Sequence, residues 1–248
     1  APVLNAGYGS SLNLNGDVEN DASIMLDDMS CGSVGALHGF ANPILAARHV
    51  MERTDHVLLV GRGADAFARH MGLAERDQRT PDRIERYQKA LAKLEAGEGI
   101  HFMPRLREFY EELRTEAEWD DDRDPESGTV GIVVRDGAGR MAAASSTGGM
   151  MLKLPGRVGD TGIIGAGTYC DQRGGVSATG HGEPVIRHGM GRALVEAFAE
   201  VGAAGAMGRV MRTACNGAFE FGLIGIDASA GVAIGYSTQA MSWAALEG

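Results

Sequence analysis

The sequence predicts an α+β domain in which helices cover a largely antiparallel sheet. Hydrophobic residues make up 44% of the 248 residues and charged residues 23%, which is enough apolar material for a substantial core. Glycine contributes 37 residues without a three-residue repeat, so we expect it to serve turns and close backbone contacts. Hairpin patterns and helical patterns fall into separate groups along the chain, which favours the α+β class.

Three segments have the pattern of a β-hairpin, in which two short apolar runs flank a glycine-containing turn. The first turn is Asn15-Gly16, the second begins at Asp136-Gly137, and the third lies within 227–231. The predicted hairpins span 11–25, 130–145 and 223–235.

Apolar residues at helical spacing predict helices over 43–53, 81–95, 106–119, 185–201 and 204–215. Asn42 and Thr80 are expected N-caps, because each stands directly before a proline at the first helical position. Glycines interrupt the pattern of the last two segments. The run 56–66 imitates a dinucleotide-binding G-x-G-x-x-A fingerprint, but the acidic residue about 20 positions further on is missing, so we predict a plain strand–turn–helix junction.

The charge and cysteine content restrict the partners and the compartment. A formal net charge of −10 argues against a nucleic-acid surface and against an anionic membrane. The apolar runs are far shorter than the roughly 18 residues that cross a bilayer, so we expect no membrane association. Cys31, Cys170 and Cys215 form neither a disulfide framework nor a zinc motif, which favours a reducing, cytoplasmic location.

An acidic stretch with proline and glycine, 116–128, has almost no apolar residue to bury. By composition it is a solvated loop or a processing linker. It ends at Gly128-Thr129, directly before the apolar run of a predicted strand. Taken alone, Thr129 would be an ordinary β-branched residue at a strand start.

Four glycine-dense turns that carry hydroxyl or charged side chains follow Thr129. They span 145–149, 154–160, 165–169 and 178–183. Together with the Asn5-Ala6-Gly7 block, these motifs make the chain resemble the plant-type asparaginases and isoaspartyl peptidases, within the N-terminal-nucleophile hydrolases, over essentially its whole length. The resemblance implies a four-layer αββα sandwich of one domain.

The resemblance also implies a precursor that cuts its own Gly128–Thr129 bond, giving an alpha part, 1–128, and a beta part, 129–248. The chemistry supports this idea, because a threonine hydroxyl needs a base to become a nucleophile. A free α-amino group, with a pKa of about 7.7 to 8.0, would supply that base on the same residue. No organic cofactor is then required.

Further roles follow from the resemblance, position by position. Thr147 would orient the Thr129 hydroxyl, and Thr179 with the Gly180 N–H would form the oxyanion hole. The other predicted substrate contacts are Arg157 for the α-carboxylate, and Asp160 with the Gly182 carbonyl for the α-ammonium.

Two nearby residues receive weaker roles. His181 is expected to be structural or merely close to the site, since the N-terminal amine already serves as the base. The loop around Asn5 is expected near the site, and the resemblance implies a sodium ion on main-chain carbonyls there. No metal site formed by side chains is expected.

The predicted function is hydrolysis of L-asparagine and of β-aspartyl dipeptides by a homo-oligomer of processed heterodimers. Relatives open with a strand and a helix before the block that corresponds to Asn5, and we expect either that the natural chain is longer or that its first layer is reduced. The alternatives are a glycosylasparaginase, which Thr147-Gly148-Gly149 disfavours, and a catalytically silent scaffold or uncut precursor.

Overall fold

The computed structural model describes residues 2–96, 103, 105, 128–217 and 219–247. Its elements follow in chain order: β1 (Glu19–Leu26), β2 (Cys31–His38), α1 (Pro43–Arg53), β3 (Leu58–Val60), α2 (Gly61–His70), α3 (Pro81–Glu95), β5 (Val130–Arg135), β6 (Met141–Thr147), a short 3-10 helix (Asp160–Gly162), β7 (Thr168–Asp171), β8 (Gly174–Gly180), α5 (Gly182–His188), α6 (Met190–Gly217), β9 (Phe221–Asp227) and β10 (Val232–Tyr236). The predicted helix 106–119 and most of the acidic stretch lie outside the described residues.

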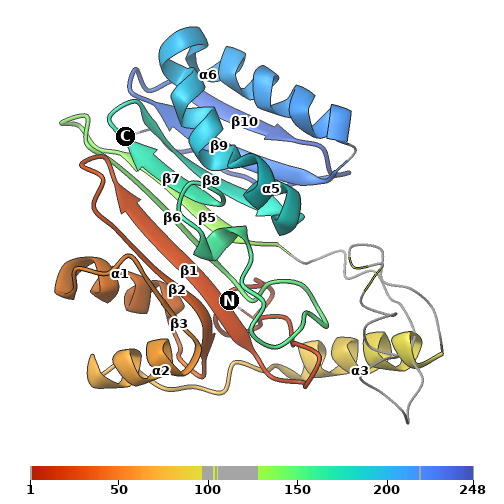
Figure 1. Cartoon of the computed structure of the whole chain (residues 1–248). Coiled ribbons are helices and arrows are strands. Elements are labelled where there is room, and N and C mark those ends of the chain that lie inside the picture. The colour runs from red at the N-terminus through yellow and green to blue at the C-terminus, as the bar shows by residue number, and fades with distance from the viewer. Residues whose placement is uncertain (1, 97–102, 104, 106–127, 218, 248) are drawn as a thin grey trace.

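Two sheets face one another in the centre of the molecule (Figure 1). One has the strand order β3-β2-β1-β6-β5 and the other β10-β9-β8-β7. The pairing is antiparallel except between β2 and β3. Helices α1 and α2 pack against the first sheet, and α6 packs against the second (Figure 1). The predicted mixture of helices with largely antiparallel sheet is therefore confirmed.

Local sequence chemistry accounts for most elements. Helices α1 and α3 begin at the predicted prolines, and the Thr80 hydroxyl accepts a hydrogen bond from the main chain of Arg83. The predicted hairpins around 136–140 and 227–231 form as β5–β6 and β9–β10. The junction of β3 and α2 is the predicted strand followed directly by a helix.

The predicted hairpin over 11–25 is wrong, although its turn exists. The Asn13 side chain accepts main-chain hydrogen bonds from Asn15 and Asp17 and so folds this segment locally. The apolar side chains of Leu12 and Leu14 pack with α3 in a separate cluster. Strand β1 therefore pairs with β2 and β6 instead.

Glycines also change two expectations in the C-terminal half. The predicted helix 185–201 is divided, because Gly189 takes a left-handed φ of 54° and ends α5. Three of the four glycine-dense segments predicted to be turns also include strand ends, since 145–147 belongs to β6, 168–169 to β7 and 178–180 to β8, whereas 165–167 forms a turn. A Cβ on Gly174 would lie 2.5 Å from the Phe198 ring, so the bare strand allows α6 to pack closely.

Polar side chains lie between the two sheets. A chain of hydroxyl contacts of 2.6–2.8 Å runs from Ser23 through Thr168 and Ser145 to Ser177. A Cβ on Gly131 would lie 1.9 Å from the Ser177 hydroxyl, so only glycine allows β5 to approach β8 this closely. This close approach determines where the residue before β5, Thr129, comes to lie.

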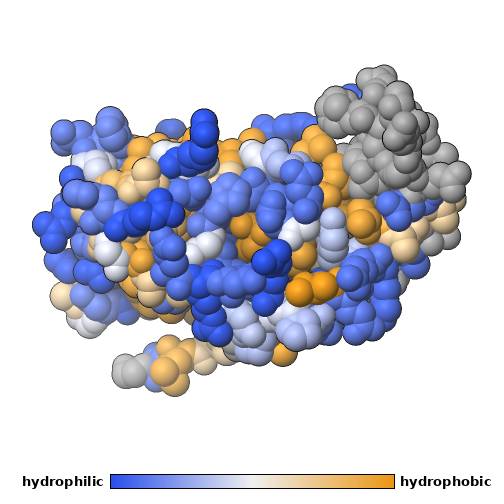
Figure 2. All heavy atoms as spheres, turned by 90° about the horizontal axis from the view of Figure 1, so that it is seen from below, coloured by the Kyte–Doolittle hydropathy of each residue, from blue (hydrophilic) through white to orange (hydrophobic). Residues whose placement is uncertain are grey.

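The surface seen in Figure 2 mixes hydrophilic and hydrophobic side chains. Within the described residues, no helix is long and apolar enough to cross a membrane. Cys31, Cys170 and Cys215 are free thiols.

Candidate functional site

Thr129 directly precedes β5, and Thr179 and Gly180 end the neighbouring strand β8. The main-chain nitrogen of Thr129 donates a hydrogen bond to the Thr179 hydroxyl over 3.1 Å. Gly180 has a φ of +112°, and a Cβ there would lie 2.5 Å from the Cα of Phe221, so the position accepts no other residue without strain. The predicted nucleophile and the predicted oxyanion residues are therefore neighbours.

A pocket opens at this end of the two sheets. It includes six residues that the sequence singled out, from five separate segments of the chain. Its lining consists of Asn5, Thr129, Thr147, Gly149, Met150, Arg157, Gly159, Asp160 and Gly180. Gly128 directly precedes this lining, and Thr179 and Gly182 contact it.

Thr147 and Asn5 support the turn that borders the pocket. The Thr147 hydroxyl, at the end of β6, accepts a hydrogen bond from the Gly149 N–H over 3.0 Å. The Asn5 amide donates to the Gly149 carbonyl over 2.8 Å, and its side-chain oxygen accepts from the Ser11 N–H. Both side chains thus fix the 147–149 turn, and Thr147 is buried with 4% exposure.

Glycines surround the guanidinium of Arg157. A Cβ on Gly159 would lie 2.8 Å from Nη1, and one on Gly182 would lie 2.8 Å from Nη2. A Cβ on Gly149 would lie 3.4 Å from Nη1. Any larger side chain at these positions would displace the guanidinium or the turn.

Glu183 is a site residue that the sequence reasoning missed. Its carboxylate accepts hydrogen bonds from Nε and Nη2 of Arg157, over 3.0 and 2.8 Å. This ion pair occupies one edge of the guanidinium and leaves Nη1 directed toward Gly149 and Gly159. The signal was present in the sequence, because Glu183 belongs to a glycine-dense block that we had singled out.

Asp160 is a buried carboxyl group at the pocket. Burial raises its pKa to about 7, although the nearby Arg157 guanidinium acts in the opposite direction. Its Oδ2 atom has no hydrogen-bond partner among the described residues. A Cβ on Gly182 would lie 2.8 Å from Oδ1, so any larger residue at the start of α5 would crowd this oxygen. An unpaired buried carboxyl oxygen at a pocket is suited to a cationic ligand.

His181 lies beside the pocket without lining it. The Nε2 atom of the His181 ring lies 3.5 Å from Glu183 Oε2. The main-chain N–H of His181 donates a hydrogen bond to the main-chain carbonyl of Glu220. These contacts are compatible with the structural role predicted for it.

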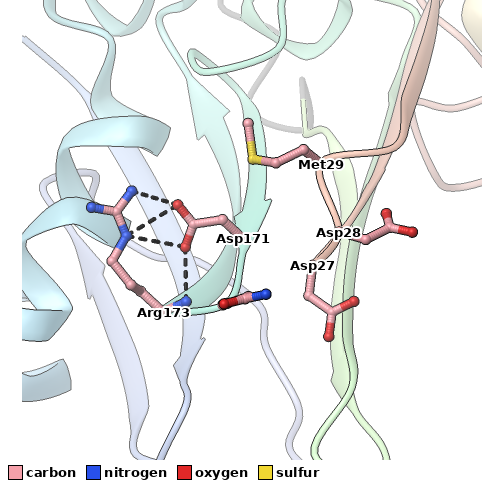
Figure 3. A pocket seen from close by; sticks show the side chains of 6 residues that line it. Asp27, Asp28, Met29, Asp171 and Arg173 are labelled. Atoms are coloured by element: carbon pink, nitrogen blue, oxygen red, sulfur yellow. Dashed lines mark hydrogen bonds and ion pairs between the residues drawn. The ribbon is translucent and has the colours of Figure 1, made fainter.

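A second pocket lies away from these residues, where the β1–β2 turn meets the β7–β8 turn. Asp27, Asp28 and Met29 come from the first turn, and Asp171, Gln172 and Arg173 come from the second (Figure 3). The Asp171 carboxylate is paired with Arg173, as Figure 3 shows. None of the predicted site residues lines this pocket.

Three main-chain carbonyl groups of the predicted sodium loop take part in hydrogen bonds within the protein. The main-chain oxygens of Asn5, Gly7 and Gly9 accept hydrogen bonds from within the protein. Among the described residues of the whole chain, no group of three or more histidine, cysteine, aspartate or glutamate side chains could hold a metal ion.

The architecture and the pocket define an α+β protein with a threonine-lined site that carries an arginine and a buried carboxyl group. The family model for asparaginases matches residues 1–248. The chain is 41% identical over 252 aligned residues to the plant-type L-asparaginase of Pyrococcus horikoshii, with 98% of this chain and 77% of that protein covered. It is 37% identical over 255 residues to the isoaspartyl peptidase/L-asparaginase of Xenopus laevis, with 99% and 74% covered. The mouse protein of the same name is 42% identical over 199 residues, with 77% and 53% covered. The chain belongs to the asparaginase family, and it is an enzyme of that family.

Proposed function

We propose that the protein hydrolyses the side-chain amide of L-asparagine and the β-aspartyl bond of isoaspartyl peptides through an ester on Thr129. The observation that carries the proposal is the 3.1 Å contact between Thr129 and Thr179 in a pocket that also contains Arg157 and Asp160. The names of the relatives, L-asparaginase and isoaspartyl peptidase, support the choice of substrates.

Maturation is the first step of the proposal. The Thr129 hydroxyl oxygen attacks the Gly128 carbonyl carbon, an ester forms, and the Gly128–Thr129 C–N bond breaks. The departing nitrogen takes up the hydroxyl proton and becomes the free α-amine. Water then hydrolyses the ester, which leaves a Gly128 carboxylate and restores the hydroxyl. The products are the alpha part, 1–128, and the beta part, 129–248.

Turnover uses the same hydroxyl with the new amine as its base. The amine accepts the hydroxyl proton while Oγ attacks the side-chain carbonyl carbon of the substrate. The Thr179 hydroxyl and the Gly180 N–H stabilise the negative charge on the attacked oxygen. The amine returns the proton to the leaving nitrogen, so ammonia or a peptide amine departs. Water then hydrolyses the β-aspartyl ester to aspartate.

The substrate clamp consists of Arg157 and Asp160. Arg157 would bind the α-carboxylate through the guanidinium nitrogens that its contact with Glu183 leaves available. Asp160, with its unpaired Oδ2, would bind the α-ammonium together with the Gly182 carbonyl. Asparagine and β-aspartyl peptides share this aspartyl group, so one clamp serves both.

The proposal also includes the wider assembly. The facing sheets and their outer helices support the four-layer αββα sandwich of N-terminal-nucleophile hydrolases. The homo-oligomer of processed heterodimers, the structural sodium ion and the cytoplasmic location stay predictions. Replacing sodium chloride by choline chloride should lower the melting temperature if a sodium ion supports the fold.

One experiment tests the core of the proposal. The wild-type chain should appear on a denaturing gel as fragments of 128 residues and, since the chain has 248, of 120 residues. It should also release ammonia from L-asparagine. Thr129→Ala should do neither, whereas Thr129→Ser keeps a hydroxyl and should still be cut. An uncut wild-type chain without ammonia release would favour the silent scaffold, and a Thr129→Ala variant with either activity would exclude Thr129 as the nucleophile.

A further inference from the structure

Three buried charged side chains near the pocket have no role in the proposed chemistry. Glu19 and Asp21 lie on β1, with 3% and 0% exposure, and Lys153 is 0% exposed in the turn after β6. Burying charges costs several kcal/mol per ion after relaxation, so such groups persist only with close polar partners. Their partners therefore indicate what they do.

The two carboxylates hold the loop that carries the substrate clamp. Residues two apart on a strand face the same side, so Glu19 and Asp21 point toward the same loop. Both oxygens of Glu19 accept from the Gly156 N–H, over 2.8 and 3.1 Å. Asp21 accepts from the Gly159 N–H over 2.8 Å. Gly156 directly precedes Arg157 in the chain, and Gly159 directly precedes Asp160.

Glu19 is ionised in this arrangement. Although burial opposes it, hydrogen bonds from His38 and from the Gly156 N–H lower the pKa of Glu19 to about 2. A carboxylate that accepts hydrogen bonds in its charged form is a stronger acceptor than a neutral one. The loop at Gly156 is therefore fixed by a charge-assisted contact.

Lys153 connects the clamp loop with the other side of the pocket. Its side-chain nitrogen donates to the main-chain oxygen of Glu19 over 2.8 Å. Burial lowers the pKa of Lys153, and the nearby Asp21 and Glu19 carboxyl groups act in the opposite direction. A Cβ on Gly149 would lie 2.9 Å from Lys153 Cδ and 3.1 Å from Nζ. The lysine side chain thus fills the space between β1 and the turn that Thr147 and Asn5 hold.

We propose that Lys153 and Asp21 are positioning residues for the substrate clamp. Lys153 sets the distance between the 147–149 turn and β1, and Asp21 fixes the clamp loop against β1. The nucleophile side and the clamp side of the pocket are thereby held in one geometry. A contribution to stability alone would not require that these contacts converge on the two borders of the pocket. The inference rests on the proposed function, because it takes Arg157 and Asp160 as substrate ligands.

The test is a KM-against-kcat comparison on L-asparagine with the full chain. Lys153→Met and Asp21→Asn should each raise KM by about 10- to 100-fold, because a displaced clamp binds the substrate poorly. The kcat per processed enzyme should stay within about threefold of the wild type, since Thr129, Thr179 and Gly180 are unaltered. Asn at position 21 offers one acceptor oxygen for the two N–H groups, of Ala36 and Gly159, that Asp21 holds.

Asp227→Asn is the matched control. Asp227 is also a buried carboxylate, with 9% exposure, and it accepts main-chain N–H groups of Ala203, Ser229 and Gly231 at the far end of β9. The Asp227→Asn variant should have a lower melting temperature than the wild type, and its KM should stay within about twofold of the wild-type value. A KM increase in Asp227→Asn equal to that in Asp21→Asn would mean that any buried carboxylate has this effect, which would overturn the proposal.

The double variant Asp21→Asn/Lys153→Met covers the case in which a single variant unfolds. It removes one negative and one positive buried charge together, so the net charge buried beside Glu19 is unchanged, and it should have a higher melting temperature than either single variant. Its KM should still be raised, because neither contact to the pocket is restored. A wild-type KM in the folded single or double variants would overturn the proposal. So would failure of all these variants to fold, since a role in folding would then account for the residues.

These outcomes are separable from failure of the proposed function. If the wild type releases no ammonia from L-asparagine, the proposed function itself is wrong. If the wild type is active and Thr129→Ala is not, an unchanged KM in Lys153→Met contradicts only the positioning role.

Discussion

The main-chain nitrogen of Thr129 lies 3.1 Å from the side-chain hydroxyl of Thr179, although Thr129 leads into β5 of one sheet and Thr179 lies on β8 of the other. The nitrogen at this position becomes the free amine if the preceding peptide bond is cut. Thr179 is therefore within reach both of the proposed base and of the site where the oxyanion would form. In the proposed chemistry, this contact would link the maturation step with the turnover step.

The first prediction concerns the Thr179 hydroxyl. Thr179→Ala should lower kcat by about 100- to 1000-fold, because one oxyanion donor is removed, with a smaller change in KM. Thr179→Ser keeps the hydroxyl and should retain most of the activity. Ammonia release at saturating L-asparagine measures both. A Thr179→Ala enzyme with wild-type kcat would remove Thr179 from the oxyanion hole.

The second prediction concerns the space at Gly182. Gly182→Ala places a Cβ 2.8 Å from Arg157 Nη2 and from Asp160 Oδ1, so we expect KM to rise by about 10-fold or more. Gly63→Ala is the control, because a Cβ at this position of α2 meets nothing within 4 Å. Steady-state kinetics on both variants should separate them. Equal KM values would show that the clamp does not depend on the glycine.

The third prediction is a pH dependence that follows from Asp160. Its pKa is about 7 in the folded protein, against an ordinary value of 3.8, so the folded state holds the proton more tightly than the unfolded state. The stabilisation is complete below about pH 4 and is lost as the pH rises toward 7, where the folded group must ionise. Asp160→Asn should therefore have a higher melting temperature than the wild type at pH 8, with the difference vanishing near pH 4. Thermal melts at the two pH values measure this.

Substrate binding should show the opposite trend at the same residue. An ionised Asp160 is needed to bind an α-ammonium, so kcat/KM should rise with pH through about 7 on its acidic limb. Asp160→Asn should lose most of kcat/KM, and the acidic limb that remains should reflect the Thr129 amine alone. Retention of full kcat/KM by the variant would contradict the role of Asp160 in the clamp.

The fourth prediction concerns the edge of Arg157 that Glu183 occupies. Glu183→Gln replaces a charged acceptor, whose Oε1 takes two hydrogen bonds from Arg157, with a neutral one, so the guanidinium should become less well oriented. We expect KM to rise by about 10-fold with little change in kcat. The control is Glu52→Gln on α1, which loses an exposed pair with Arg48 and should leave KM unchanged. A lower KM in Glu183→Gln would instead indicate that Glu183 competes with the substrate carboxylate.

Local sequence signals predicted the elements whose chemistry is local. Prolines after Asn42 and Thr80 marked the starts of α1 and α3, and glycine turns marked the hairpins β5–β6 and β9–β10. The segment 11–25 had the same hairpin pattern but did not form one, because its apolar side chains pack with α3 rather than with a second strand. A pattern of alternation does not say which partner covers the apolar face.

The sequence by itself determined the family, the residue types of the candidate site and the mixed α/β class, because these depend on motifs that are contiguous in the chain. The tertiary structure decided which of those residues meet. Thr129 and Thr179 are 50 positions apart, and Lys153 lies 134 positions from Glu19, so sheet packing alone brings each pair into contact. Glu183 stands in a motif that the sequence analysis singled out, but its pairing with Arg157 and the contacts of Asp21 could not be predicted from it, since hydrogen bonding depends on distances of about 3 Å that only the folded backbone fixes.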